Sequence, residues 1–449
     1  MMAQLVPSWL RQHSGHRTVL AIALPIMAAN VSEPLIGLVD TWVIGRLPQA
    51  YFIGAVALGA MIFSLVFWAF GFLRMGTGGL SAQAHGAKDS AEVRAVLARA
   101  LMIGVAIGLA LIALSPLIEY VSFALLQGSD EVEFHARTYF QIRILSAPFA
   151  LANYAFLGWF IGLGQARTAF MLQLLLNVSN MVFDVVLVLG FGMKADGVAL
   201  GTLLASMVAA VGGVWAAHLE LKRRGGSWDM ARVLDRVQLR RTYAVNFDIM
   251  VRSVAAVLVF VMFTAKSAEV GDVILAANTV LMNIMVFGTH LIDGFAHSAE
   301  ALVGQAVGAK SRMRFRVYAV LSSQWAFVIG IAFALLTWAL GPFVIDALTV
   351  NQEIRDTARA YLWWIIAAPI LGVGCYQLDG IFIGATQSKD LRNMMLISLV
   401  MFLAAWQTLT EIFGNHGLWA SVMLFLVARA LTLLARVPAL MRERFPLSP

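Results

Sequence analysis

The chain has 449 residues, of which 60% are hydrophobic and 13% are charged, whereas a soluble domain carries about a quarter charged residues. This composition excludes an ordinary soluble enzyme, and it supplies enough apolar residues for about twelve helices that cross a bilayer with about 20 residues each. The formal net charge of +7 favours either a nucleic-acid partner or, in a membrane protein, basic cytoplasmic loops.

Apolar runs between charged or Gly/Pro-rich breaks predict twelve membrane-spanning helices. The first six lie near residues 19–44, 52–74, 95–118, 137–161, 168–190 and 197–219, and the second six near 243–265, 273–299, 315–340, 358–384, 391–412 and 416–437. The sustained alternation of polar and apolar residues that is typical of β-barrel strands does not occur. We therefore expect an all-α integral membrane protein.

The basic residues predict the orientation of these spans. With the N-terminus inside, 22 of the 32 lysines and arginines fall on the cytoplasmic side and six on the other. This bias predicts a multi-pass protein of the cytoplasmic (inner) membrane with both termini in the cytoplasm. It also accounts for the positive charge without a nucleic-acid partner. The predicted organisation is an N-terminal lobe at 1–220, a basic cytoplasmic linker at 221–241 and a C-terminal lobe at 242–449.

The two lobes are internal repeats. A shift of 222 positions aligns Gln83–Lys88 with Gln305–Lys310, Ala136–Tyr139 with Ala358–Tyr361, and Phe160–Gly162 with Phe382–Gly384. Each repeat holds an even number of spans, so both have the same orientation and are related by an axis along the membrane normal. This arrangement is typical of secondary transporters.

Polar side chains form two stripes within the first repeat. Glu33 and Asp40 lie two turns apart on the first span, and Asn177, Asn180 and Asp184 share one face of the fifth. An ionised carboxylate inside a membrane costs several kcal/mol, so these groups are candidates for function. If the stripes face each other, burial and like-charge repulsion favour a proton on one carboxyl group.

The repeat separates these groups from residues that both lobes need. Asp40 corresponds to Met262 and Asp184 to Trp406, so the ionisable site belongs to the first lobe only. The alternative is that one aspartate forms a fixed ion pair with Arg74 or Arg143.

Other residues of the first lobe allow two interpretations each. Pro25 and Pro34 interrupt the first span, and either lets the helix adopt two shapes or bends it permanently. Thr202 either joins the polar network or bonds to its own helix. Glu33 lies either in the substrate cavity or at a water-filled mouth, and Tyr139 is a further candidate for the cavity wall.

The second lobe has polar groups of its own. His290, Asp293, His297 and Glu300 share one helix face, which could bind a metal but is explained more simply as a polar cavity wall or as intrahelical ion pairs. We predict Asp293 and Asp379 in the substrate cavity and no resident metal. The remaining pair, Asp248 and Arg252, has the i, i+4 spacing of a structural ion pair.

Several of these motifs resemble those of a known family. The segments are Leu24-Pro25, Pro34-Leu-Ile-Gly-Leu-Val-Asp-Thr-Trp-Val-Ile-Gly45, the repeated Gln-Ala-x-Gly-Ala-Lys, Phe160-Ile-Gly-Leu-Gly-Gln165 and Asn177-x-x-Asn180-x-x-x-Asp184. They resemble the multidrug and toxic compound extrusion (MATE) transporters, and most closely the DNA-damage-inducible F branch.

This resemblance implies twelve helices in two lobes and export of cationic drugs in exchange for H⁺ or Na⁺. It also implies that Asp40, Asn180, Asp184 and Thr202 form a network in which protonation of Asp40, with bending near Pro25, releases substrate. The chain departs from the branch that uses acidic sites in the C-terminal lobe, because its seventh span carries Asp248 in place of a glutamate.

We therefore expect a proton-coupled antiporter that exports organic cations or amphipathic compounds, works as a monomer within membrane lipid and needs no cofactor besides the coupling ion. Two alternatives stay open. One is Na⁺ coupling through the oxygens of Asp40, Asn180 and Asp184, and the other is a flippase for lipid-linked precursors, which Arg74, Arg143 and Arg252 would suit. The motifs of a membrane enzyme, such as HExxH or GxSxG with its partners, do not occur.

Overall fold

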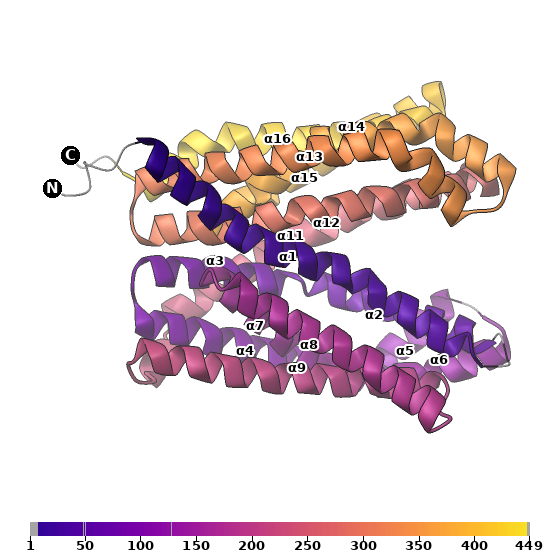
Figure 1. Cartoon of the computed structure of the whole chain (residues 1–449), viewed down its shortest axis with the longest axis horizontal. Helices are drawn as coiled ribbons and strands as arrows, with labels where there is room; N and C mark the ends of the chain where they lie inside the picture. The colour runs from indigo at the N-terminus through magenta and orange to yellow at the C-terminus, as the bar shows by residue number, and fades with distance from the viewer. Residues whose placement is uncertain (1–7, 48, 50, 127, 447–449) are drawn as a thin grey trace. The chain divides into compact units, whose positions relative to one another are not determined.

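The computed structural model describes residues 8–47, 49, 51–126 and 128–446, except for the side chains of residues 8–14, 33–35, 38 and 41. These residues form an all-helical fold without a strand (Figure 1). The elements before the linker are α1 (Ser8–Ile44), α2 (Tyr51–Ala69), α3 (Phe72–Gly86), α4 (Ser90–Ala113), α5 (Ser115–Leu125), α6 (Asp130–Arg143), η2 (Ile144–Ser146), α7 (Ala147–Gly162), α8 (Ala166–Asp184), η3 (Val185–Gly190) and α9 (Ala195–Arg224). They are followed by α10 (Met230–Val233), α11 (Arg236–Val270), α12 (Asp272–Gly308), α13 (Arg312–Leu348), α14 (Gln352–Gly384), α15 (Ser388–Phe413) and α16 (Asn415–Arg444).

The predicted spans are confirmed. Eleven helical segments within the described residues are long and apolar enough to cross a membrane, and they overlap the second to the twelfth predicted spans one to one. The predicted first span lies in α1, a continuous helix of 37 residues. Most helices extend several residues beyond the predicted ends, because polar residues continue a helix into the interfacial layer that flanks the 30 Å hydrocarbon core.

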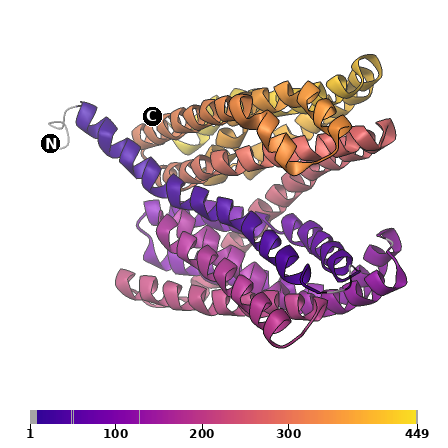
Figure 2. The ribbon, with the colours of Figure 1, turned by 45° about the vertical axis from the view of Figure 1, so that its right-hand side comes forward.

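The chain forms two compact units. One comprises Ala28–Tyr243, and the other comprises the chain before Ala28 and after Tyr243. In the first unit α3 packs against α4 and α7, and α8 packs against α9; in the second α12 lies beside α13 and α14, and α15 beside α16 (Figures 1 and 2). The boundary within α1 lies two residues after Pro25, whose ring removes the backbone hydrogen bond to the carbonyl group of Ala21.

The sequence repeat returns as a repeat of the backbone. Three pairs of residues that are 222 positions apart have positive φ angles, and each pair ends equivalent helices: Lys88 (58°) and Lys310 (51°), Gly164 (75°) and Thr386 (50°), and Gly192 (70°) and Gly414 (56°). Lysine and threonine rarely adopt this left-handed conformation. Its recurrence at one offset therefore identifies the two units as copies of one fold.

Close helix crossings repeat in the same way. At Gly158 a Cβ atom would overlap the carbonyl oxygen of Arg74, and at Gly380 it would overlap that of Ala296. Gly158 and Gly380 are 222 positions apart in the sequence, and so are Arg74 and Ala296. The two glycines let α7 approach α3 and α14 approach α12 at backbone contact distance, which explains why glycine occurs at both positions.

The helices of the first unit are interrupted where those of the second are continuous. The chain breaks between α2 and α3, between α4 and α5, at η2 between α6 and α7, and at η3 after α8. The equivalent helices α12, α13, α14 and α15 run without a break. Prolines lie at two of these breaks. Pro116, at the start of α5, and Pro148, at the start of α7, each lack the backbone N–H group that would continue the preceding helix. The pattern of apolar residues does not mark these four breaks.

Candidate functional site

Two carboxyl groups meet inside the first unit. Asp40 lies in the last turns of α1, and Asp184 is the last residue of α8. Their side chains lie within hydrogen-bonding reach of each other. Asp184 is fully buried. The structure therefore brings together the two aspartates that the sequence places on separate polar stripes.

The oxygen atoms of this pair lack donors. Neither carboxyl oxygen of Asp184, nor Oδ1 of Asp40, nor Oδ1 of Asn180 has a hydrogen-bond partner among the described residues. Carboxylates can only accept hydrogen bonds, so a hydrogen bond between Asp40 and Asp184 requires a proton on one of them. In a site of low dielectric constant, two negative charges at this separation repel strongly. The arrangement suits a proton or another small cation.

The end of α8 is shaped to hold Asp184. A Cβ atom at Gly201 of α9 would overlap Oδ1 of Asp184, so the carboxyl group fills the space that a side chain would take. The next residues, Val185–Gly190, form a π-helical turn. Such turns shift the helical register and occur frequently at functional sites.

The amide groups beside the pair connect three helices. The Asn180 side chain donates to the hydroxyl group of Thr202 (3.2 Å), which in turn donates to the carbonyl group of Val198 (3.0 Å). The Asn177 side chain donates to the hydroxyl group of Ser32 on α1 (2.9 Å). Thr202 thus does both things that the sequence allows, because it bonds to its own helix and joins the network.

Arg143 lies close to this site without an ion pair to it. Its guanidinium group donates to the hydroxyl group of Tyr139 and lies over the Phe63 ring at 4.9 Å. Within the described part of the chain no ion pair joins Arg143 to Asp40 or Asp184. Tyr139, a predicted cavity residue, is completely buried against Gly59.

Two predicted residues of the first span are Glu33 and Pro34. The side chains of Glu33 and Pro34 lie outside the described residues, although α1 continues through both positions. Pro25 is half-buried within the same helix.

The second unit contains a different charged cluster. Asp379 on α14 is buried and accepts hydrogen bonds through Oδ2 from both Arg252 and Arg429. We call this set the arginine clamp. The predicted pair of Asp248 with Arg252 is wrong: Asp248 instead accepts from Arg392 (2.6 Å) and Ser388 (2.7 Å). Spacing along one helix contributes a few tenths of a kcal/mol, and these contacts with other helices outweigh it.

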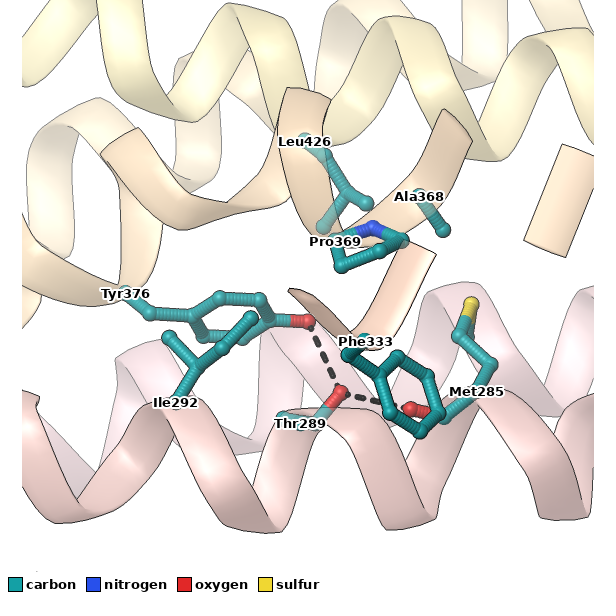
Figure 3. A pocket seen from close by; sticks show the side chains of 8 residues that line it. All are labelled: Met285, Thr289, Ile292, Phe333, Ala368, Pro369, Tyr376 and Leu426. Atoms are coloured by element: carbon teal, nitrogen blue, oxygen red, sulfur yellow. Dashed lines mark hydrogen bonds between the residues drawn. The ribbon is translucent and has the colours of Figure 1, made fainter. Parts of the chain in front are cut away.

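A small pocket adjoins the arginine clamp. It is lined by Met285, Thr289, Ile292, Phe333, Ala368, Pro369, Tyr376 and Leu426 (Figure 3). Its free space suffices for about one water molecule. The Tyr376 hydroxyl group points at that of Thr289, 3.4 Å away, and Arg429 lies over the Tyr376 ring at 5.8 Å. Arg429 is one of four arginines that lie inside predicted spans, but the sequence did not predict that it and Tyr376 belong to this cluster, because only tertiary contacts bring them to Asp379 and Thr289.

The polar face of α12 contains a contact of the predicted kind. His297 Nδ1 lies 3.2 Å from a carboxylate oxygen of Glu300, and both side chains are buried. His290 and Asp293 are half-buried on the same helix. Among the residues that the structure describes, no group of three or more histidine, cysteine, aspartate or glutamate side chains could hold a metal ion.

Comparisons with known proteins place the chain in a family. The family model MatE matches residues 25–186 and 249–405. The chain belongs to the MatE family. It is 38% identical to DNA damage-inducible protein F of Escherichia coli (strain K12), over 94% of this chain and 92% of that protein. It is 22% identical to multidrug export protein MepA of Staphylococcus aureus (strain bovine RF122 / ET3-1), over 95% of this chain and 94% of that protein.

The fold of this MatE protein is also that of a solved relative. A crystal structure of MATE in the bent conformation superimposes with a TM-score of 0.86 at 20% identity, covering 96% of this chain and 97% of that chain. The predicted resemblance to MATE transporters is confirmed, as is the all-helical membrane fold. The protein is accordingly a transporter and not an enzyme.

Proposed function

We propose that this MatE protein is a proton-coupled antiporter that exports organic cations or amphipathic toxic compounds. The observation that carries the proposal is the facing pair of Asp40 and Asp184, whose oxygen atoms lack donors within the described residues. A buried acceptor-only site attracts either a proton or a cationic substrate. The name of the relative MepA, a multidrug export protein, supports export as the direction of transport.

The proposed cycle uses this competition. In the outward-open state a proton from outside neutralises Asp40, which weakens the hold on a bound cation and permits return to the inward-open state. Thermodynamic reciprocity requires that substrate binding lower the proton affinity by the same factor. Asn177, Asn180 and Thr202 position the two acids. Pro25 supports a change of shape, because it removes a hydrogen bond of α1 close to the boundary between the units.

Transport into reconstituted vesicles tests this proposal. We expect an imposed pH gradient to drive uptake of a fluorescent organic cation, and both Asp40→Asn and Asp184→Asn to reduce it at least about tenfold, since each removes an acid of the pair. Asp356→Asn, which alters an exposed carboxylate on α14, is the matched control and retains parental uptake. Full proton-driven transport by Asp40→Asn would overturn the mechanism.

The same oxygens favour one second candidate, Na⁺ coupling, because hard cations prefer carboxylate and carbonyl oxygen ligands. A Na⁺ gradient at equal pH on both sides distinguishes the two, since it drives uptake only under Na⁺ coupling. The flippase alternative gains no comparable support, because Arg143 donates to Tyr139 and Arg252 to Asp379.

The orientation belongs to the same proposal. The distribution of basic residues supports a protein of the cytoplasmic membrane with both termini in the cytoplasm. A protease added to right-side-out vesicles is then expected to leave both termini intact, and cleavage of a terminal tag would contradict this orientation.

A further inference from the structure

The segment between α9 and α11 is fastened to the first unit along one side. Arg232 donates two hydrogen bonds of 2.8 Å to the carboxylate of Asp89, and its own carbonyl group accepts one from Arg99 (3.4 Å). Val233 is buried where α10 packs against α4. The linker therefore has a fixed inner side and a defined outer side.

Apolar side chains stand out from this fastened linker. Four of them are between 51% and 74% exposed: Trp228, Met230, Leu234 and Val237. They lie between α9 and the start of α11, two helices that cross the membrane. The ends of such helices lie at the level of the lipid headgroups, where tryptophan is enriched. We call these four residues the apolar linker face.

Basic side chains without partners accompany this face. Lys222, Arg223, Arg236 and Arg240 are exposed, and their side chains take part in no hydrogen bond or ion pair among the described residues. They therefore present four positive charges without a direct ion-pair partner among the described residues.

None of the nearby acids forms an ion pair with these four residues among the described residues, because each contacts other groups. Asp229 caps α10 through Ala231 N–H (3.0 Å), and Asp235 accepts from Gln238 N–H (2.8 Å) at the start of α11. Glu220 holds Arg224 (2.6 Å).

We propose that the apolar linker face and its four free basic residues form a docking surface for the headgroups of anionic phospholipids. Basic residues beside exposed apolar side chains are the composition that binds at a negatively charged membrane surface. The positive-inside rule accounts for basic residues in a loop, but it does not account for four exposed apolar side chains among them or for acids that are all engaged elsewhere. The fastened inner side holds both groups of side chains in place for lipid before it binds.

An environment-sensitive fluorophore at position 230 tests the proposal on the full-length protein. Cys375, the only native cysteine, is completely buried, so a Met230→Cys variant labels selectively. The labelled protein is placed in nanodiscs of phosphatidylcholine with zero to about 40% phosphatidylglycerol, so that the density of anionic headgroups is the variable. We expect the emission to shift to the blue as phosphatidylglycerol increases, and the shift to reverse at about 1 M salt, where the Debye length is about 3 Å.

Charge variants identify the residues involved. Each basic residue near an anionic surface changes lipid affinity about fivefold, so the variant K222Q/R223Q/R236Q/R240Q is expected to abolish the shift. The matched control K310Q/R312Q/R314Q/R316Q removes the same charge from the other unit and leaves the shift intact. The proposal is overturned if the emission of the labelled protein does not change with phosphatidylglycerol content, or if both quadruple variants lose the blue shift equally. The salt titration tests the contact without any charge substitution, and neither readout depends on transport.

Discussion

The two units hold charged centres of opposite design. In the first, Asp40 and Asp184 face each other, and their oxygens lack donors within the described residues. In the second, Asp379 is held between Arg252 and Arg429, which supply the cations permanently. A carboxylate with two guanidinium partners has no need of a mobile cation, whereas the acid pair does. The comparison favours the proposal that a coupling ion is exchanged in the first unit, whereas the ion pairs of the second form a fixed contact between helices.

The repeat shows that neither centre is required by the fold. At the positions of Asp40 and Asp184 the second unit has Met262 and Trp406. At the positions of Arg252, Asp379 and Arg429 the first unit has uncharged residues, which are Asn30, Leu157 and Met207. Each centre was therefore added to, or lost from, one copy of a shared bundle.

The helices around the acid pair are broken, whereas the helix that carries Asp379 is continuous. The π-helical turn η3 follows Asp184 directly, and η2 follows Arg143. Asp379, by contrast, lies within the continuous helix α14. Broken helices line the substrate sites of many transporters, and they can change shape at lower cost than continuous ones. The breaks lie in the unit to which we assign the coupling ion.

Breaking the arginine clamp is expected to have the largest effect on stability. Asp379→Leu installs the residue of the first unit but leaves two buried guanidinium groups without their carboxylate. Removing one partner of a buried ion pair costs about 3–5 kcal/mol, measurable as a loss in the free energy of unfolding in mixed micelles.

Two further variants complete this test. Asp346→Leu breaks an ion pair with Arg359 whose side chains are 37% exposed, and is expected to cost less than about 1 kcal/mol. The triple variant Arg252→Asn/Asp379→Leu/Arg429→Met transplants the whole set of the first unit and is expected to recover most of the loss. If the triple variant were no more stable than Asp379→Leu, the clamp would not act as a unit.

The second largest effect is expected from a methyl group at Gly201, which would disturb the acid pair. Gly201→Ala places a carbon atom where Oδ1 of Asp184 lies, so the carboxyl group must move. Such overpacking costs about 1–3 kcal/mol, and the displaced acid is expected to reduce proton-driven transport as well. Gly190→Ala, which meets no atom within 4 Å, serves as the control. The corresponding residue of the second unit is Met423, so the small residue is specific to the site of the acids.

Neutralising the acid pair is expected to change stability in the opposite direction to breaking the clamp. Asp184→Asn gives Asp40 a permanent N–H donor, so that a hydrogen bond between the two side chains no longer requires the uptake of a proton. The free energy of unfolding at neutral pH is therefore expected to rise by about 1 kcal/mol, while transport is lost. A fall in stability would show instead that Asp184 is ion-paired in the folded protein.

The smallest expected effect concerns the cap of α4. Partial burial alone would raise the pKa of Asp89, but hydrogen bonds from Glu92 N–H and Arg232 lower the pKa below its ordinary value. A depressed pKa contributes stability at higher pH that is lost as pH falls below about 4. Its equivalent, Ser311, caps α13 without a charge. Asp89 is 40% exposed, so the contribution is about 0.5 kcal/mol.

The substitution Asp89→Ser copies the second unit at this cap. The free energy of unfolding is expected to fall less between pH 6 and pH 3 in this variant than in the parent protein, as measured by unfolding at both pH values. An unchanged difference would mean that Asp89 does not contribute to acid unfolding.

Much of the fold followed from the sequence because its signals are local. Twenty apolar residues have few stable states in a bilayer other than a helix, so all twelve spans could be placed. The repeat was visible because Gln-Ala-x-Gly-Ala-Lys ends a helix through a left-handed lysine in both units. The pairing of Asp40 with Asp184 was expected from two polar stripes, since a carboxyl group in a membrane needs a polar neighbour.

Other features required contacts between distant residues. Arg252 is four residues from Asp248, yet it pairs with Asp379, 127 residues away, and the linker is fastened by Asp89, 143 residues from Arg232. The sequence by itself thus determined the helices, their number and the acids that stand out among apolar residues, because hydropathy and helical period act over short distances. Only the tertiary structure decided which charge neutralises which, because a buried ion pair depends on the meeting of helices that the chain order leaves open.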